Sequence, residues 1–397
     1  MADTMGDPWL TIIGMTDDTA EALPPASLTA LAQAEAIFGG IRHLDLVKAG
    51  PRGQAWPIPF SVIPVLAQRG KPVVVLASGD PFWFGAGGSL SEHLTPGEWR
   101  VIPAPSTFSL IAGHLGWRME EISCHGLHAT PFTALRRALT PEGRMICLLR
   151  DGNAPAELAQ WLTDHGAGQA DLWVCERMGG THQRLRQTTA ADFNLADVAA
   201  PVAMAIELPR NVGVPRVAGL PDDTFAHDGQ ITKRPVRALT LAALAPRPGD
   251  LLWDIGAGSG SIAVEWCLAG GRAIAFEQRE SRVANIAQNV TDFGLSHKMQ
   301  VVAGDAATAL KNQPTPDAVF VGGGGTSALF DHLFALLNKG TRLVANGVTL
   351  ETESLLTQLH ATKGGDLMRI ELAQATPLGN MRGWQPARAI VQWSVEL

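Results

Sequence analysis

One short segment constrains the fold of this chain more than any other. Residues 251–260 read LLWDIGAGSG, an apolar run that ends in an acidic residue and continues into alternating glycines. A helical pattern, Ser261–Leu268, follows directly. A buried strand that turns through glycines into a helix presents backbone N–H groups at the carboxyl end of a parallel sheet, where such sheets bind ligands. The segment therefore predicts a parallel α/β domain with a ligand site at this loop.

The glycine spacing indicates the kind of ligand. The loop follows G-x-G-x-G, whereas the dinucleotide pattern G-x-G-x-x-G requires glycine at the position of Ser261. This departure disfavours a nicotinamide dinucleotide and favours a nucleoside ligand without a pyrophosphate. The candidate cofactor-binding residues of the loop are Gly256, Ala257, Gly258, Ser259 and Gly260.

Two further loops add polar groups to the same edge of the predicted sheet. The strand Ala273–Phe276 ends at Glu277, whose carboxylate is placed to accept the hydroxyls of a ribose. The next strand, Val301–Val302, leads to Gly304, Asp305 and Ala306, where a side chain and backbone can meet an adenine edge. These loops follow neighbouring parallel strands, so we expect one shared site.

The rest of the second half continues the alternation of strands and helices. Further strands are expected at Ala318–Val321 and Arg342–Ala345, with a final edge strand at Ala387–Val395. Helices are expected at Ser281–Phe293, Leu329–Leu337 and Thr352–His360. The fourth strand is followed by Gly322–Gly325, which offers no side chain to a nitrogen nucleophile. This stretch is either room for a large flat substrate or a flexible loop.

The first half has its own strand-to-loop signals. The buried run Val73–Leu76 leads into Gly79, Asp80 and Pro81. An earlier strand, Leu10–Ile13, ends at a loop, residues 14–18, that keeps a single glycine. Helices are expected at Leu28–Ala36 and Ser106–Leu115, and the hydroxyls of Ser106 and Thr107 stand at the start of the second one.

A proline-rich stretch divides the chain nearly in half. Leu208–Asp223 carries Pro209, Pro215 and Pro221 among small residues, which predicts an extended linker. A chain of 397 residues is also longer than one core usually supports. We therefore expect two α/β domains, residues 1–212 and 213–397.

Charge and cysteine content exclude several classes of protein. The formal charge of −7 disfavours a nucleic-acid-binding protein, which needs a basic face. The four cysteines form no metal-ligand spacing, so we expect no metal and reduced thiols. Met1–Pro8 lacks the apolar core of a signal peptide, and no apolar run reaches the length of a membrane span. These features predict a cytoplasmic protein without a membrane or nucleic-acid partner.

The motifs of the two halves resemble two different families of methyltransferases. Asp254–Gly260, Glu277 and Asp305–Ala306 match three motifs of the Rossmann-like class I enzymes that use S-adenosylmethionine (SAM). Gly79–Pro81 and Pro105–Ser106 resemble turns of the tetrapyrrole methylases, the class III enzymes that use SAM. The resemblance implies one SAM per domain, with Gly79, Asp80, Ser106 and Thr107 at the first site.

The order of the two domains and the linker between them resemble the bifunctional decarboxylating precorrin methyltransferases of cobalamin biosynthesis. The matching linker stretches read GLPDDTF at residues 219–225 and ITKRPVR at residues 231–237. The resemblance implies methylation of precorrin-6B at carbons 5 and 15, loss of carbon dioxide from the carbon-12 acetate, and precorrin-8 as product. It also implies a role for Thr232 in SAM binding, and a homo-oligomer.

Several other residues are candidates with a structural alternative. Lys233, Arg234 and Arg237 either bind substrate carboxylates or are solvated charges at a helix start. His227 and Asp228 are candidates for proton transfer, but the sequence identifies no general base.

The histidine pair His125 and His128 lacks a third metal ligand, which favours ordinary hydrogen bonding. Trp56, Trp83 and Trp384 either stack on a flat macrocycle or pack in a core.

Three other functions remain open at this point. One is SAM-dependent methylation of another substrate, such as RNA or protein. The second is a regulatory SAM-binding protein with one inactive domain, for which the residue 14–18 loop makes the first domain the candidate. The third is a nicotinamide dehydrogenase, against which the glycine spacing counts.

Overall fold

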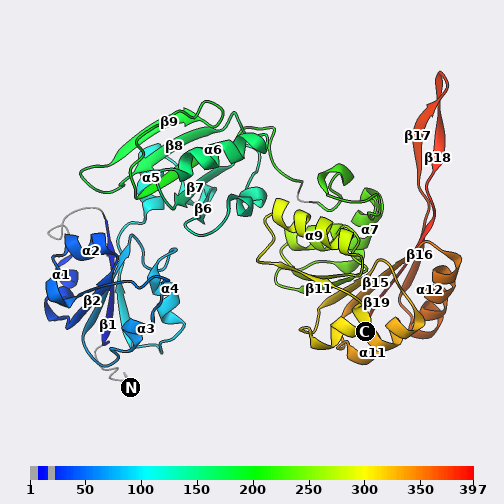
Figure 1. Ribbon diagram of the computed structural model, residues 1–397, viewed down its shortest axis with the longest axis horizontal. Helices are drawn as coiled ribbons and strands as arrows, with labels where there is room; N and C mark the ends of the chain where they lie inside the picture. Colours follow the sequence, from blue (N-terminus) through cyan, green and yellow to red (C-terminus); the bar gives the residue numbers. More distant parts are fainter. Residues whose placement is uncertain (1–7, 17–22, 216) are drawn as a thin grey trace. The chain divides into compact units, whose positions relative to one another are not determined.

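The computed structural model describes residues 8–16, 23–215 and 217–397. The chain forms two compact units (Figure 1). The first unit comprises Met1–Thr130 and Ala138–Val212, and the second comprises Pro131–Arg137 and Gly213–Leu397. Residues 1–7 of the N-terminal segment, and Asp17 and Asp18 of the first loop, lie outside the described residues.

The first unit begins with a five-stranded parallel sheet in the order β3-β2-β4-β1-β5. Its strands are β1 (Leu10–Met15), β2 (Ala36–Gly39), β3 (Gly53–Ala55), β4 (Val73–Ser78) and β5 (Trp99–Ile102). Its helices are α1 (Pro25–Gln33), α2 (Ile41–Leu46), α3 (Ile63–Leu66), α4 (Ala86–Ser91) and α5 (Thr107–Leu115).

Both faces of this sheet are covered, as a parallel sheet requires. Along β1, Leu10 and Ile12 share one apolar cluster with residues of α3 and α4, while Ile13 and Met15 share another with residues of α1. Since β1 and β4 pair in parallel, the loops that leave Met15 and Ser78 start at the same edge of the sheet.

The second half of the first unit is a mixed sheet in the order β6-β7-β10-β8-β9. Only β6 and β7 pair in parallel; the other neighbours are antiparallel. The elements are β6 (Ile122–Gly126), β7 (Arg144–Leu149), α6 (Ala154–Asp164), β8 (Asp171–Glu176), β9 (Arg184–Thr189) and β10 (Val202–Glu207).

The second unit is a seven-stranded sheet in the order β13-β12-β11-β14-β15-β19-β16, in which β19 runs antiparallel to both of its neighbours. Its strands are β11 (Leu251–Ile255), β12 (Arg272–Glu277), β13 (Met299–Ala303), β14 (Ala318–Val321), β15 (Arg342–Gly347), β16 (Asp366–Ile370) and β19 (Ile390–Glu396). Its helices are α7 (Arg234–Leu244), α8 (Ser261–Leu268), α9 (Glu280–Asp292), α10 (Ala306–Ala309), α11 (Ser327–Leu336) and α12 (Leu350–Lys363).

Helices α7, α8 and α9 share one apolar cluster with the sheet, and α11 and α12 share the cluster of the opposite face. A hairpin of β17 (Ala373–Leu378) and β18 (Met381–Pro386) extends away from this sheet as a two-stranded arm (Figure 1). No described helix is long and apolar enough to cross a membrane.

Two of the predicted elements differ from those observed. The last strand, β19, is not an edge strand, because β16 pairs along its outer side. The first helix spans Pro25–Gln33 instead of Leu28–Ala36: Pro25 occupies its first turn, and Ala36 already belongs to β2. The first error arises from pairing with a strand that the local pattern does not reveal, and the second from a proline start and an early following strand.

Candidate cofactor sites

The glycine loop of the second unit lies between β11 and α8, as predicted. Gly256, Gly258 and Gly260 all have positive φ angles, of 69°, 61° and 71°. A Cβ atom on Gly256 would lie 2.6 Å from the carbonyl oxygen of Gly323 in the loop after β14. Only glycine therefore permits both the backbone conformation and the close approach of these two loops.

The carboxylate of Glu277 organises this loop. Its Oε2 accepts a hydrogen bond from the Gly258 N–H at 2.8 Å, and its Oε1 accepts one from the Arg279 N–H at 2.9 Å. Each carboxylate oxygen has further acceptor capacity, so Glu277 can orient the loop and still accept ribose hydroxyls.

Asp254 lies beneath the loop and is fully buried. Its Oδ2 accepts from the Ala263 N–H at 3.2 Å, while its Oδ1 has no hydrogen-bond partner within the described part of the chain. Burial raises the pKa of Asp254 to about 7, against the opposing effect of the Ala263 hydrogen bond. The hydroxyl of Ser259, also buried, lacks a partner there too. The loop thus carries polar atoms with unused bonding capacity.

Asp305 is placed at the same edge of the sheet, but its side chain has a structural task. It is the N-cap of α10, where its Oδ2 accepts from the N–H of Thr308 at 3.2 Å. The preceding Gly304 N–H donates to the carbonyl of Glu277 at 3.0 Å, so the loops after β12 and β13 lie in contact. Asp305 and Ala306 are therefore positioned beside Glu277, as the order of motifs predicts.

Arg237 is not available to a substrate. Its side chain has no exposed surface, and its Nε donates to Glu265 at 2.6 Å. A terminal nitrogen donates to Asp222 at 3.1 Å, and the guanidinium lies 4.7 Å from the ring centroid of Phe225. The prediction that Arg237 binds substrate carboxylates is therefore wrong, because the carboxylates it binds are internal.

The neighbouring Lys233 and Arg234 do reach solvent. The ammonium group of Lys233 is 3.6 Å from a carboxylate oxygen of Asp222, and its side chain is 59% exposed. Arg234 contacts the same carboxylate only through its backbone N–H. Of the predicted basic set, these two side chains face outward.

His227 and Asp228 form a tight turn, and the contacts of their side chains within the described residues hold that turn. Nδ1 of His227 accepts from the Gly229 N–H at 3.0 Å, and Asp228 accepts from the Gln230 N–H at 3.0 Å and from Arg282 at 2.9 Å. The Arg282 hydrogen bond holds the pKa of Asp228 below its usual range. A carboxylate that is stabilised as an anion is a poor proton acceptor, so Asp228 acts as an anchor for the turn.

In the first unit, the predicted turns meet at one edge of the parallel sheet. Gly79 has a φ of 58°, and its N–H donates to the carbonyl of Met15 at 2.7 Å. A Cβ atom on Gly79 would lie 2.9 Å from the Cα of Ser106. Ser106 caps α5 by accepting from the Ser109 N–H at 3.1 Å. Asp80 accepts from its neighbour Phe82 at 2.8 Å and so shapes the turn.

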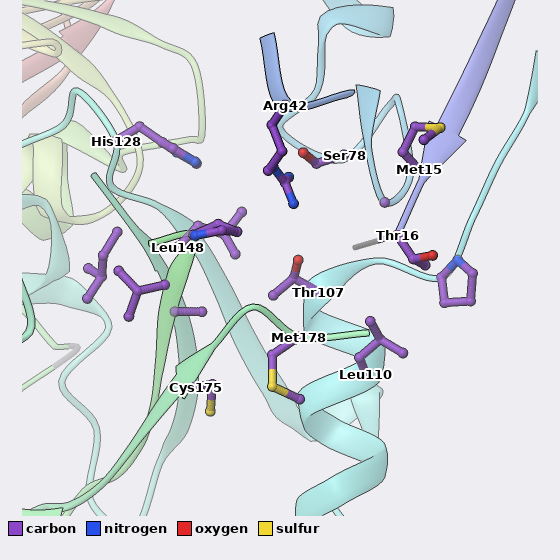
Figure 2. A pocket seen from close by; sticks show the side chains of 16 residues that line it. Met15, Thr16, Arg42, Ser78, Thr107, Leu110, His128, Leu148, Cys175 and Met178 are labelled. Atoms are coloured by element: carbon purple, nitrogen blue, oxygen red, sulfur yellow. The ribbon is translucent and has the colours of Figure 1, made fainter. Parts of the chain in front are cut away.

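A cavity opens between the two sheets of the first unit (Figure 2). Met15, Thr16, Ser78 and Thr107 line one side, and residues of the mixed sheet, among them Cys175, line the other. A second, larger cavity of about 550 Å³ carries the aromatic rings of Trp56, Phe60, Trp83 and Phe84. The residues that line both cavities are Ser78, Thr107, His128 and Leu148.

The two tryptophans of the larger cavity are thus placed where stacking is possible, whereas Trp384 lies on the β17–β18 arm and is 77% exposed. His128 borders both cavities, and His125 lies in β6 with a buried Nε2 that has no described partner. Ordinary hydrogen bonding, favoured for the pair, is not observed at His125 Nε2. The described His, Cys, Asp and Glu side chains include no group of three or more suited to a metal ion.

Two residues of this site escaped sequence reasoning. Arg42 lines the smaller cavity and His43 the larger one. Nε2 of His43 is 3.1 Å from a guanidinium nitrogen of Arg42, which donates, and 3.2 Å from the Ser78 hydroxyl. Burial, followed by the charge of Arg42, lowers the pKa of His43 to about 4, so the ring is neutral. No motif marks this pair, because it comes from a short helix beside a strand of no special composition.

Comparison with known proteins defines the class of each unit. Residues 10–194 match the family of tetrapyrrole (corrin/porphyrin) methylases, and residues 223–397 match the precorrin methyltransferase domain. These matches agree with the two resemblances drawn from the motifs.

Relatives that span both units identify the family. A precorrin-6Y C(5,15)-methyltransferase (decarboxylating) of Sinorhizobium sp. is 45% identical, covering 98% of this chain and 96% of the relative. One of Mycobacterium tuberculosis (strain CDC 1551 / Oshkosh) is 38% identical, covering 97% and 98%. The crystal structure of the C-terminal domain of the Rhodobacter capsulatus enzyme is 61% identical, with a TM-score of 0.46, covering 46% of this chain and all of that one. The two relatives that span both units show that the chain belongs to the family of decarboxylating precorrin-6Y C(5,15)-methyltransferases.

Proposed function

We propose that this protein methylates precorrin-6B at carbons 5 and 15 and removes carbon dioxide from the carbon-12 acetate, giving precorrin-8 for cobalamin biosynthesis. The observation that carries the proposal is the 45% identity to a bifunctional relative across 98% of the chain. The two units divide at residues 212 and 213, apart from residues 131–137, which supports a division of labour between domains 1–212 and 213–397.

Each unit would bind one SAM. In the second unit, Gly256–Gly260 would lie against the cofactor, with Glu277 at the ribose, Asp305–Ala306 at the adenine, and Thr232 beside the loop. In the first unit, Gly79, Asp80, Ser106 and Thr107 would border it. Bound SAM supplies a methyl group already activated on a sulfonium. The protein's main task is therefore to position donor and acceptor in line.

The second unit would carry out decarboxylation and methylation at carbon 15, and the first unit methylation at carbon 5. The two cavities of the first unit support this assignment, because they share the residues Ser78, Thr107, His128 and Leu148. A cofactor and a substrate on either side of these residues would meet there. The aromatic rings of the larger cavity provide apolar surface for a flat macrocycle.

Exposed basic residues of the second unit would bind substrate carboxylates. Lys233 and Arg234 are the candidates, since Arg237 is buried. No metal enters the proposed reaction, because the macrocycle itself can accept the electron pair that remains when carbon dioxide leaves.

We propose further that the chain forms a homo-oligomer. The arm of β17 and β18 is a two-stranded ribbon with exposed apolar side chains at Leu378, Met381 and Trp384. An isolated hairpin is marginally stable in water. Packing against another copy would bury this apolar surface, so it supports an assembly.

The decisive experiment is incubation of the protein with precorrin-6B and SAM, followed by mass spectrometry. The expected product gains two methyl groups and loses one carbon dioxide. An unchanged substrate mass would overturn the proposed function. Calorimetric titration with SAM should give two sites per chain; a single site would favour one inactive domain.

A further inference from the structure

The predicted linker is not a free spacer along its whole length. From Gly219 to Lys233 the chain is fastened to the second unit by side chains of α7, α8 and α9. We call residues 219–233 the strap. At its start, the carboxylate of Glu265 accepts from the N–H groups of Gly219 at 2.6 Å and Leu220 at 2.9 Å. The strap then contacts α9 at Asn289 and Arg282 and reaches the glycine loop at Gln230.

The middle of the strap is held by a single buried amide. Asn289 of α9 has no exposed surface. Its Oδ1 accepts from the Ala226 N–H at 2.7 Å, and its Nδ2 donates to the Ala226 carbonyl at 3.0 Å. The same Nδ2 donates to the carbonyl of Ser259, in the glycine loop, at 2.8 Å. One side chain therefore connects the strap to the loop.

A second contact on the same helix holds the strap two residues further on, at Asp228. Arg282, seven residues before Asn289, pairs with Asp228 at 2.9 Å. The turn that follows brings the carbonyl of Gln230 within 3.4 Å of the position a Cβ atom on Gly258 would take. The strap thus lies against the glycine loop at the point where a cofactor is proposed to bind.

We infer that Asn289 is the residue that positions the strap against the glycine loop of the second unit. This inference rests on the proposed binding of SAM to that loop. An amide is suited to the task because it donates and accepts at once. Aspartate has nearly the same shape but cannot donate to the two carbonyls of Ala226 and Ser259, and its charge would face them.

The test compares Asn289→Asp and Asn289→Ala with Gln288→Ala in the full-length chain. Gln288 is the adjacent residue of α9, is exposed, and makes a hydrogen bond only to Asp292 among the described residues. We expect both Asn289 variants to weaken SAM binding at the second site about tenfold, which corresponds to one or two lost hydrogen bonds. The Asn289 variants should bind SAM normally at the first site. The Gln288→Ala control should bind SAM normally at both sites.

Hydrogen exchange without SAM provides a readout that does not depend on activity. Amides of residues 226–230 and 256–260 should exchange faster in the Asn289 variants, while those of the β11 strand keep the wild-type rate. If the variants lose thermal stability but keep the wild-type SAM affinity and loop exchange, Asn289 is only structural and the inference fails. If the wild-type second unit binds no SAM, the proposed function fails instead.

Discussion

In the second unit, the candidate cofactor site is centred on one loop of alternating glycines, which the side chains of Glu277 and Asn289 hold in place. In the first unit, the candidate site is a cavity between two sheets, lined by residues from many separate parts of the chain. The site of the second unit therefore has its main sequence signal in ten contiguous residues, 251–260. The site of the first unit takes its residues from many separate segments, so no single stretch of sequence reveals it.

We expect the largest effect of this difference when the internal ion pairs of the two units are broken. Arg237 is fully buried against Glu265, whereas Arg184, which pairs with the buried Glu176, is 45% exposed. We expect Arg237→Met to lower the free energy of unfolding of the second unit by about 3–5 kcal/mol, because a buried carboxylate loses its partner. Arg184→Met should cost the first unit about 1 kcal/mol, because Glu176 keeps Arg186 and the Ala199 N–H as partners.

Urea denaturation followed by peptide-resolved hydrogen exchange would measure both values in the same chain. Equal losses in the free energy of unfolding from the two substitutions would contradict the expected difference between the units. Adding Glu265→Leu should restore only part of the loss, because Glu265 also accepts the amides of Gly219 and Leu220.

Glycine substitutions should separate the two sites. Gly256→Ala would place a methyl group 2.6 Å from a backbone oxygen, and Gly79→Ala one 2.9 Å from a backbone carbon, each at a positive φ. We expect each variant to lose one of the two SAM sites, with affinity reduced about 100-fold at that site. Calorimetry of the full chain measures this directly.

The matched controls are Gly249→Ala in the second unit and Gly70→Ala in the first. Both glycines have a φ of 89° and open space around the Cβ position, so they test strain without a clash. If Gly256→Ala or Gly79→Ala abolished both SAM sites, the two units would not bind SAM independently.

Two buried groups, one in each unit, should contribute to stability with opposite pH dependence. His43 has its pKa lowered from 6.5 to about 4, so its contribution is present above pH 6.5 and is lost as the pH falls through 4. Asp254 has its pKa raised from 3.8 to about 7, so its contribution is present below pH 3.8 and is lost as the pH rises through 7.

The variants His43→Gln and Asp254→Asn isolate these effects when each is compared with the wild type between pH 4 and 8. Relative to the wild type, Asp254→Asn should become more stable as the pH rises. His43→Gln should lose less stability than the wild type as the pH falls. If the difference in stability between a variant and the wild type does not change with pH, the pKa shift assigned to that residue is wrong.

The smallest expected effect concerns the exposed arginine at the start of α7. Arg234→Ala should raise the KM for precorrin-6B about threefold to tenfold and leave SAM binding unchanged, since one exposed charge contributes about 1 kcal/mol. Arg247→Ala is the matched control, because Arg247 is also exposed but precedes β11 at the opposite end of the sheet. An unchanged KM would remove Arg234 from the proposed substrate site.

The sequence allowed prediction of those features whose cause is local. Strand β11 and helix α8 occupy the predicted residues, Glu277 binds the glycine loop, and the loop before Asp305 contacts Glu277. Burial was not predictable in the same way: Arg237 stands in a basic run that looks solvated, and only the fold brings Glu265 to it. Likewise, Arg42 and His43 reach the first site through the sheet topology, which no spacing in the chain reveals.

The strap has a consequence for how such a protein can be split or fused during evolution. The match to the precorrin methyltransferase domain begins at residue 223, but Glu265 already binds the amides of Gly219 and Leu220. A gene that encodes the second unit alone must therefore start before the codon for Gly219, or Glu265 loses the two amides it accepts from and Arg237 loses the carbonyl of Leu220. The point at which two ancestral genes were joined is accordingly expected upstream of the strap, not within it.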